Sequence, residues 1–183
     1  MSQDVTRWLG AGSALLGGSL WTLSWLLNVS LTNSSGEGTR LGFTEGAARS
    51  VLNPAIALFT VCVIVLYQRV GSWANGSGFW APALAIAGLG LMLAGNLMEF
   101  GLVGTSSIES EDPGFFVFTL GLLATAGGLA ALALLVFRSG SPTNAQKLGL
   151  VLLPVSVFLM PLFGVAWVLW SYLLWRAPAP RAT

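Results

Sequence analysis

One stretch of the chain decides the fold: residues 80–103, WAPALAIAGLGLMLAGNLMEFGLV, in which Glu99 is the single charged residue. A helix needs about 20 mostly apolar residues to cross about 30 Å of hydrocarbon. This stretch is long enough and apolar enough to do so. We therefore predict a membrane-spanning helix over 80–103.

The rest of the chain repeats this pattern. Only 8% of the residues are charged, whereas a soluble domain has about 25%. Such a chain cannot cover a water-facing surface, and its mean hydropathy of +0.78 also favours lipid as the solvent. Four further stretches between charges predict spans at about 8–31, 50–69, 114–137 and 148–175.

These spans predict an all-α, polytopic membrane helical bundle of about five transmembrane helices. We expect a single integral membrane domain over residues 1–183, with a disordered, proline-rich tail at 176–183. The first apolar stretch is longer than the apolar region of a cleavable signal peptide. A composition rich in Ala, Gly and Leu is typical of a bacterial chain, so we expect a multi-pass protein of the bacterial cytoplasmic membrane.

The fifth stretch leaves two topologies open, because it contains Pro154 and Pro161. We expect one kinked, tilted span. The alternative is a pair of half-helices that enter and leave through one face, and nothing polar lies between the prolines to hydrate such a turn. We call the membrane side of the N-terminus face A and the opposite side face B. With one span at 148–175, each face carries four Lys or Arg residues, so the positive-inside rule gives no orientation.

Small residues recur at helical spacing in several spans. Gly10, Ala14 and Gly18 share a face of the first span, and Gly90–Ala94, Ala124–Gly128 and Gly127–Ala131 repeat the spacing later. In lipid, such faces let helix backbones approach closely. They predict tight packing within the chain or, alternatively, contact with a protein partner or a second copy.

Polar residues of different spans fall at a similar depth, toward face B. The predicted ligand-binding residues are Glu99, Asn96, Asn53, Asn28, Trp25, Trp167, Trp170 and Arg49. The functional interpretation is a pocket open to face B, with amide and carboxylate groups beside rigid aromatic walls. The alternative is that these groups form interhelical hydrogen bonds worth about 0.6 kcal/mol each.

Glu99 has two interpretations of its own. Ionisable groups inside a span are functional-site hypotheses, and Asn96 lies one turn away on the same helix face. We expect Arg49, at the mouth of the second span, to neutralise the carboxylate. Alternatively, Glu99 is shallow enough to meet interfacial water.

The segment Leu52-Asn53-Pro54-Ala55 resembles the Asn-Pro-Ala box of aquaporins, which starts a half-helix in that family. The family pattern has two such boxes and a longer chain. This sequence has a single box, so it is not assigned to the family.

Composition also limits the chemistry. The chain has no histidine and a single cysteine, Cys62, so it lacks the commonest metal ligand and general base. We expect no catalytic residue, no metal site and no cofactor. With a net charge of +1 and no basic run, no nucleic-acid partner is expected.

The sequence therefore favours a non-catalytic accessory or binding protein. The expected partners are membrane lipids, a lipophilic small molecule and a protein partner. The alternative function is a small transporter or channel in which Glu99 binds a proton or a cation.

Overall fold

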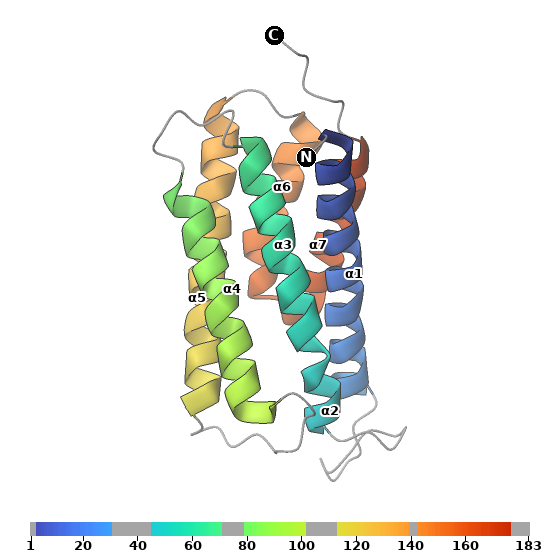
Figure 1. Cartoon of the computed structure of the whole chain (residues 1–183), viewed down its shortest axis with the longest axis vertical. Coiled ribbons are helices and arrows are strands. Elements are labelled where there is room, and N and C mark those ends of the chain that lie inside the picture. Colours follow the sequence, from blue (N-terminus) through green and yellow to red (C-terminus); the bar gives the residue numbers. More distant parts are fainter. Residues whose placement is uncertain (1–2, 31–44, 71–78, 102–112, 140–142, 177–183) are drawn as a thin grey trace.

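The computed structural model of the chain describes residues 3–30, 45–70, 79–101, 113–139 and 143–176. All regular secondary structure in these ranges is helical, which confirms the predicted all-α fold (Figure 1). The helices are α1 (Gln3–Ser30), α2 (Glu45–Ser50), α3 (Leu52–Val70), α4 (Trp80–Phe100), α5 (Pro113–Ser139), α6 (Asn144–Val157) and α7 (Met160–Arg176). The tail at 176–183 lies outside the described residues, apart from Arg176 at the end of α7.

Three helical segments are long and apolar enough to cross a membrane: Gly46–Gln68, Trp80–Phe100 and Pro113–Leu135. Large apolar side chains also cover the outside of the bundle; Leu16 and Phe116 are 58% and 65% exposed. Outward apolar surfaces of this extent indicate a membrane protein. The predicted number of about five transmembrane helices is compatible with this bundle. By length and composition, three of the described segments meet the criteria for a membrane span.

The helices lie along one common axis (Figure 1). α1 runs from the upper end of the view to the lower end, α3 returns, α4 descends and α5 ascends. The bundle consists of a pair formed by α4 and α5 and a group formed by α1, α3 and α7; α3 also packs on α4, and α6 packs on α5 and α7.

The stretch 148–175 is two antiparallel helices rather than one kinked span. α6 descends along α5 and ends at Val157, and α7 begins at Met160 and ascends (Figure 1). The contacts with α1 fix the direction of α7, because Gly18 faces Val168 and Gly164, whereas Trp21 reaches Met160. The C-terminal end of α7 therefore lies beside the N-terminal end of α1. The expected single span is wrong, and the alternative of two half-helices is the observed arrangement.

Protein groups form several hydrogen bonds at the turn between α6 and α7. Two tight backbone bonds close it: the Phe158 N–H donates to the Val155 carbonyl at 3.3 Å, and the Leu159 N–H donates to the Ser156 carbonyl at 2.9 Å. The Trp21 indole Nε1 donates to the Met160 carbonyl at 2.8 Å. The expectation failed because it considered only polar groups inside the stretch, whereas the donor comes from α1.

α4 and α5 pack backbone against backbone. The contact uses Gly88 and Gly95 of α4 and Gly114, Gly121 and Gly128 of α5, and a Cβ atom added at any of them would meet backbone atoms of the facing helix. We call these five glycines the glycine seam. Their seven-residue spacing is that of a left-handed coiled pair. Gly90 and Gly127, which belong to the predicted four-residue stripes, point away from this seam.

The second span begins with a break. α2 ends at Ser50 and α3 starts at Leu52, so that Pro54 occupies the first turn of α3. A proline there is tolerated because its missing N–H would have no helical partner. α2 lies at the lower end of α3 (Figure 1) and contacts α1 and α4, so that the Arg49 carbonyl accepts a bond from Asn96.

Candidate functional site

The polar residues predicted on the second and third spans meet at the face B end. Asn96 Nδ2 donates to Asn53 Oδ1 at 2.7 Å and to the Arg49 carbonyl at 3.3 Å. Asn53 Nδ2 lies 3.4 Å from the Gly101 carbonyl, which accepts from it. We call Arg49, Asn53, Asn96 and Glu99 the polar cluster. The structure brings its two amides together as the sequence predicted.

Local sequence explains why these groups converge. Gly101 ends α4 with φ +62°, a left-handed conformation that glycine adopts at little cost, and its N–H bonds to the Leu97 carbonyl. The turn exposes the Gly101 carbonyl to Asn53. On the other side, Ser24 Oγ donates to the Ala48 carbonyl at 2.8 Å and fixes α2 against α1. Asn53 therefore connects α3 to the end of α4.

Glu99 is enclosed by protein rather than exposed at the end of a span. Its side chain is 7% exposed, and it lies one turn after Asn96 on α4. Gly114 of α5 faces it: a Cβ there would lie 3.0 Å from the Glu99 nitrogen and 3.1 Å from its Cβ. The helical turn that carries Glu99 therefore packs directly against α5, and Gly114 leaves the space that this packing needs.

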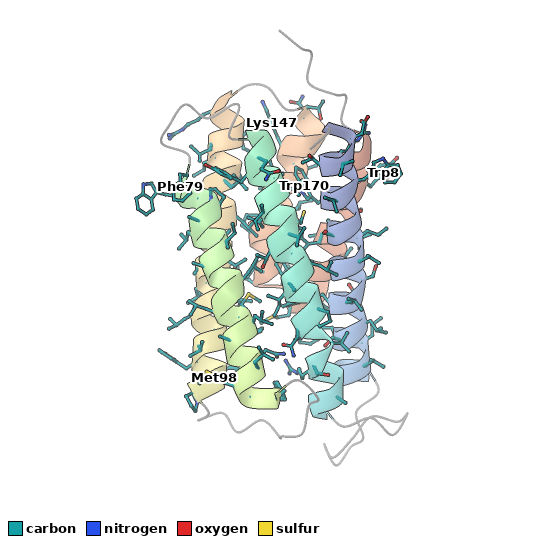
Figure 2. The ribbon with its side chains drawn as sticks, viewed as in Figure 1. Trp8, Phe79, Met98, Lys147 and Trp170 are labelled. Atoms are coloured by element: carbon teal, nitrogen blue, oxygen red, sulfur yellow. The ribbon has the colours of Figure 1, made fainter. Side chains whose placement is uncertain are left out.

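Trp167 and Trp170 do not join the polar cluster. Trp170 lies near the upper end of the bundle with Lys147, whereas Met98, beside Glu99 in the chain, lies at the lower end (Figure 2). The reversal of α7 explains the difference, since a single span would have carried both tryptophans toward face B. The expected grouping of these two rings with the amides is wrong.

Trp167 belongs to an aromatic core between α1, α3 and α7. It stacks on Phe59 with ring centroids 4.7 Å apart, and Phe163 contacts both Phe59 and Trp21 edge-on. All four rings are fully buried. Among the described residues, the buried Nε1 atoms of Trp167 and Trp170 have no hydrogen-bond partner; the Trp167 ring packs against Phe59 and Phe163.

The structure describes the side chain of one of the other two predicted residues, Trp25. Trp25 is half-buried and packs against the core. Asn28 is the third residue from the end of α1, and its side chain lies outside the described part of the chain. The ligand-binding role of the predicted residues stays a prediction.

The sequence reasoning missed a second site, an outward-facing groove between α5 and α6. Its volume is about 760 Å³. We call it the α5–α6 groove; all of its lining residues are apolar or glycine: Leu123, Ala126, Gly127, Ala130, Ala133, Leu134, Phe137, Val151, Pro154, Val155, Phe158 and Leu159. The small residues near Gly127 are a sequence feature of this groove. Their spacing on α5 does not show, however, which side chains the facing helix presents.

Metal chemistry finds no support in the described ranges, where no group of three or more Cys, Asp or Glu residues could hold an ion. Neither a protein-family model, nor a curated protein, nor a solved structure matches the chain.

Proposed function

We propose that this chain is a multi-pass protein of the bacterial cytoplasmic membrane, a non-catalytic binding or accessory protein whose α5–α6 groove takes up a lipophilic chain. The observation that carries the proposal is the groove itself. Its walls are apolar throughout, and it opens outward between two apolar helices. A concave apolar surface of this size is typical of a ligand site.

The polar cluster supports ligand binding less well than the groove. Its two amides are used in bonds to each other and to backbone carbonyls, which join α2, α3 and α4. Interhelical hydrogen bonds of this kind contribute about 0.6 kcal/mol each. We assign the amides to holding the face B end of the bundle together.

The direct test compares two glycines that both face outward. At Gly127 an added Cβ would meet only Leu84 Cδ2 at 3.7 Å, and at Gly90 it would meet nothing within 4 Å. Gly127→Leu fills the groove, whereas Gly90→Leu places the same side chain elsewhere. Native mass spectrometry from mild detergent should find lipids on the parent protein and on Gly90→Leu, and fewer on Gly127→Leu. Equal lipid retention by all three would contradict binding in the groove.

The reversal of α7 also supports an orientation. In the proposed topology α1, α3, α4 and α5 cross the membrane, and the α6–α7 hairpin enters and leaves through face A. By chain order, the Lys and Arg residues on face A are then Arg7, Arg69, Arg138, Lys147, Arg176 and Arg181. Face B keeps Arg40 and Arg49. The positive-inside rule now gives a cytoplasmic face A.

Reporter fusions test this topology. Fusions at residue 1 and at residue 183 should both localise to the cytoplasm. A cytoplasmic reporter at one end and a periplasmic reporter at the other would restore the single fifth span and contradict the hairpin.

A second candidate function is proton or cation transport through Glu99. The observation that favours it is the burial of this carboxyl within a predicted span, one turn from Asn96. Liposomes containing the protein should then show proton or cation flux that Glu99→Gln abolishes. Flux equal to that of empty liposomes would reject this candidate.

The charge-reversing substitution Glu99→Lys should lower the stability of the protein, because it introduces a second cation near Arg49.

A further inference from the structure

We propose that the α5–α6 groove binds one acyl chain of an anionic phospholipid, and that Lys147 binds the phosphate of its headgroup. The inference rests on the proposed function, because it names the class of lipid that the groove takes. Three observations carry it: the dimensions of the groove, the cation at one end of it, and the charge of the membrane face on which that end opens.

The dimensions suit a lipid chain. The lining residues of α5 run from Leu123 to Phe137, which corresponds to about 21 Å along the helix axis. One leaflet contributes about 15 Å of hydrocarbon, half of the bilayer core. The groove is therefore long enough to hold a chain through the leaflet, from the face A end down to Phe158 and Leu159 at the tip of the hairpin.

The volume suits an occupant that is narrower than a helix, because a helix would protrude from the groove. A helix about 10 Å wide and about 21 Å long fills roughly 1,600 Å³. The groove holds about 760 Å³, which is less than half of that. A single extended chain is narrower than a helix and needs no hydrogen-bond partner from the walls.

A cation marks the upper end of the groove. Lys147 Nζ lies 5.8 Å from the centroid of the Phe137 ring, and Phe137 is a groove residue. The side chain of Lys147 is half-buried, and it lies at the upper end of the bundle (Figure 2). Long lysine side chains at span ends reach toward the interface while their stems cover apolar surface. An ammonium group in this position can meet a lipid phosphate.

Charge favours an anionic lipid over a zwitterionic one. In the proposed topology, face A carries six Lys or Arg residues and one acid, Asp4. Asp4 lies on α1, which packs on α2, α3 and α7 rather than on α5. A basic side chain that contacts the anionic headgroup contributes about 1 kcal/mol, a factor of about five in affinity, and Lys147 is the cation that lies against the groove residue Phe137. The preference should therefore depend on Lys147.

The test measures two lipids with identical acyl chains, phosphatidylglycerol and phosphatidylcholine, on the full-length protein by native mass spectrometry. The parent protein should bind phosphatidylglycerol about fivefold more tightly. Lys147→Gln should remove that preference: it should weaken phosphatidylglycerol binding about fivefold and phosphatidylcholine binding less, because the choline cation offsets the charge of the phosphate. Arg138→Gln, which removes a neighbouring exposed cation next to Phe137, is the matched control and should change the preference less than twofold. Gly127→Leu should reduce the binding of both lipids.

Three other results would contradict different parts of the proposal. A preference for phosphatidylglycerol that survives Lys147→Gln, or no preference in the parent protein, overturns the headgroup assignment and leaves the groove as a lipophile site. Binding of both lipids that is insensitive to Gly127→Leu overturns the proposed function as well. A dimer that retains no lipid would show that a second copy covers the groove, and would also overturn the proposal.

Discussion

The two sides of α5 are both rich in small residues, yet one is closed and the other is open. Toward α4, Gly114, Gly121 and Gly128 meet backbone atoms directly. Toward α6, Ala126, Gly127, Ala130 and Ala133 line the α5–α6 groove. The same helix therefore forms a backbone-to-backbone interface with α4 and one wall of the α5–α6 groove.

The facing helix accounts for the difference. α4 presents Gly88 and Gly95 in register with the glycines of α5, so the two backbones can approach. α6 presents Val151, Pro154 and Val155, whose larger side chains line the groove and keep the axes apart. A small residue permits close approach only where the partner is small at the same level.

The largest effect should come from adding a methyl group to the glycine seam. In Gly121→Ala, the new Cβ would press on the Met92 nitrogen and lie 2.6 Å from the Gly88 carbonyl oxygen. Backbone cannot move aside as a flexible side chain can, so we expect a loss of about 3 kcal/mol in the free energy of unfolding. Reversible unfolding in mixed micelles measures it. Gly90→Ala is the control, and equal stability of the two variants would contradict the seam.

A smaller loss is expected at the polar cluster, which holds the bundle through side chains. Asn96→Ala removes bonds to Asn53 Oδ1 and to the Arg49 carbonyl, and we expect a loss of about 1–2 kcal/mol. A double-mutant cycle with Asn53→Ala should give a coupling energy of at least about 0.5 kcal/mol. Strictly additive losses would show that the amide pair contributes nothing of its own.

Trp21→Phe should cost about 1 kcal/mol, the usual net contribution of one hydrogen bond. The substitution keeps an aromatic ring beside Phe59 and Phe163 but removes the donor to the Met160 carbonyl. Leu159 is exposed at the tip of the hairpin. A cysteine introduced there should be modified faster in Trp21→Phe, because the turn opens more often. Trp25→Phe should leave that rate unchanged, and equal rates in both variants would remove Trp21 from this role.

The smallest effect is expected on the open side of α5. Gly127→Ala adds a Cβ that meets only Leu84 Cδ2 at 3.7 Å. Alanine is the better helix former by about 1 kcal/mol, so stability should stay equal or rise by up to that amount. A loss comparable to that of Gly121→Ala would mean that the two sides of α5 do not differ.

Much of the fold could be predicted because charged side chains are rare in the parts of helices that lie in lipid. The neutral stretches place α3, α4 and α5 within a few residues of their observed bounds. The hairpin could not be predicted in the same way. Its turn depends on Trp21, which lies 139 residues from Met160 in the chain, and a local pattern contains no such information.

For the candidate sites too, some features could be predicted from the sequence and others could not. Asn53 and Asn96 were expected to meet because each lies at the same depth of adjacent spans, and they do. Trp167 and Trp170 were misplaced because their depth was inferred from the wrong direction of α7. The α5–α6 groove is a property of two helices together, so the side chains of α5 alone did not reveal it.

The bond between Trp21 and Met160 also constrains how the protein is made. Synthesis starts at the N-terminus, so the ribosome produces the indole donor early and the carbonyl that it satisfies near the end. α6 and α7, with 14 and 17 residues, are each shorter than the about 20 residues that usually cross the bilayer. In the proposed topology we therefore expect them to enter the membrane as a pair, after the preceding helices have assembled. A chain truncated before Met160 would lack this closing step, and its first helix would keep an unsatisfied donor for quality-control proteases to find.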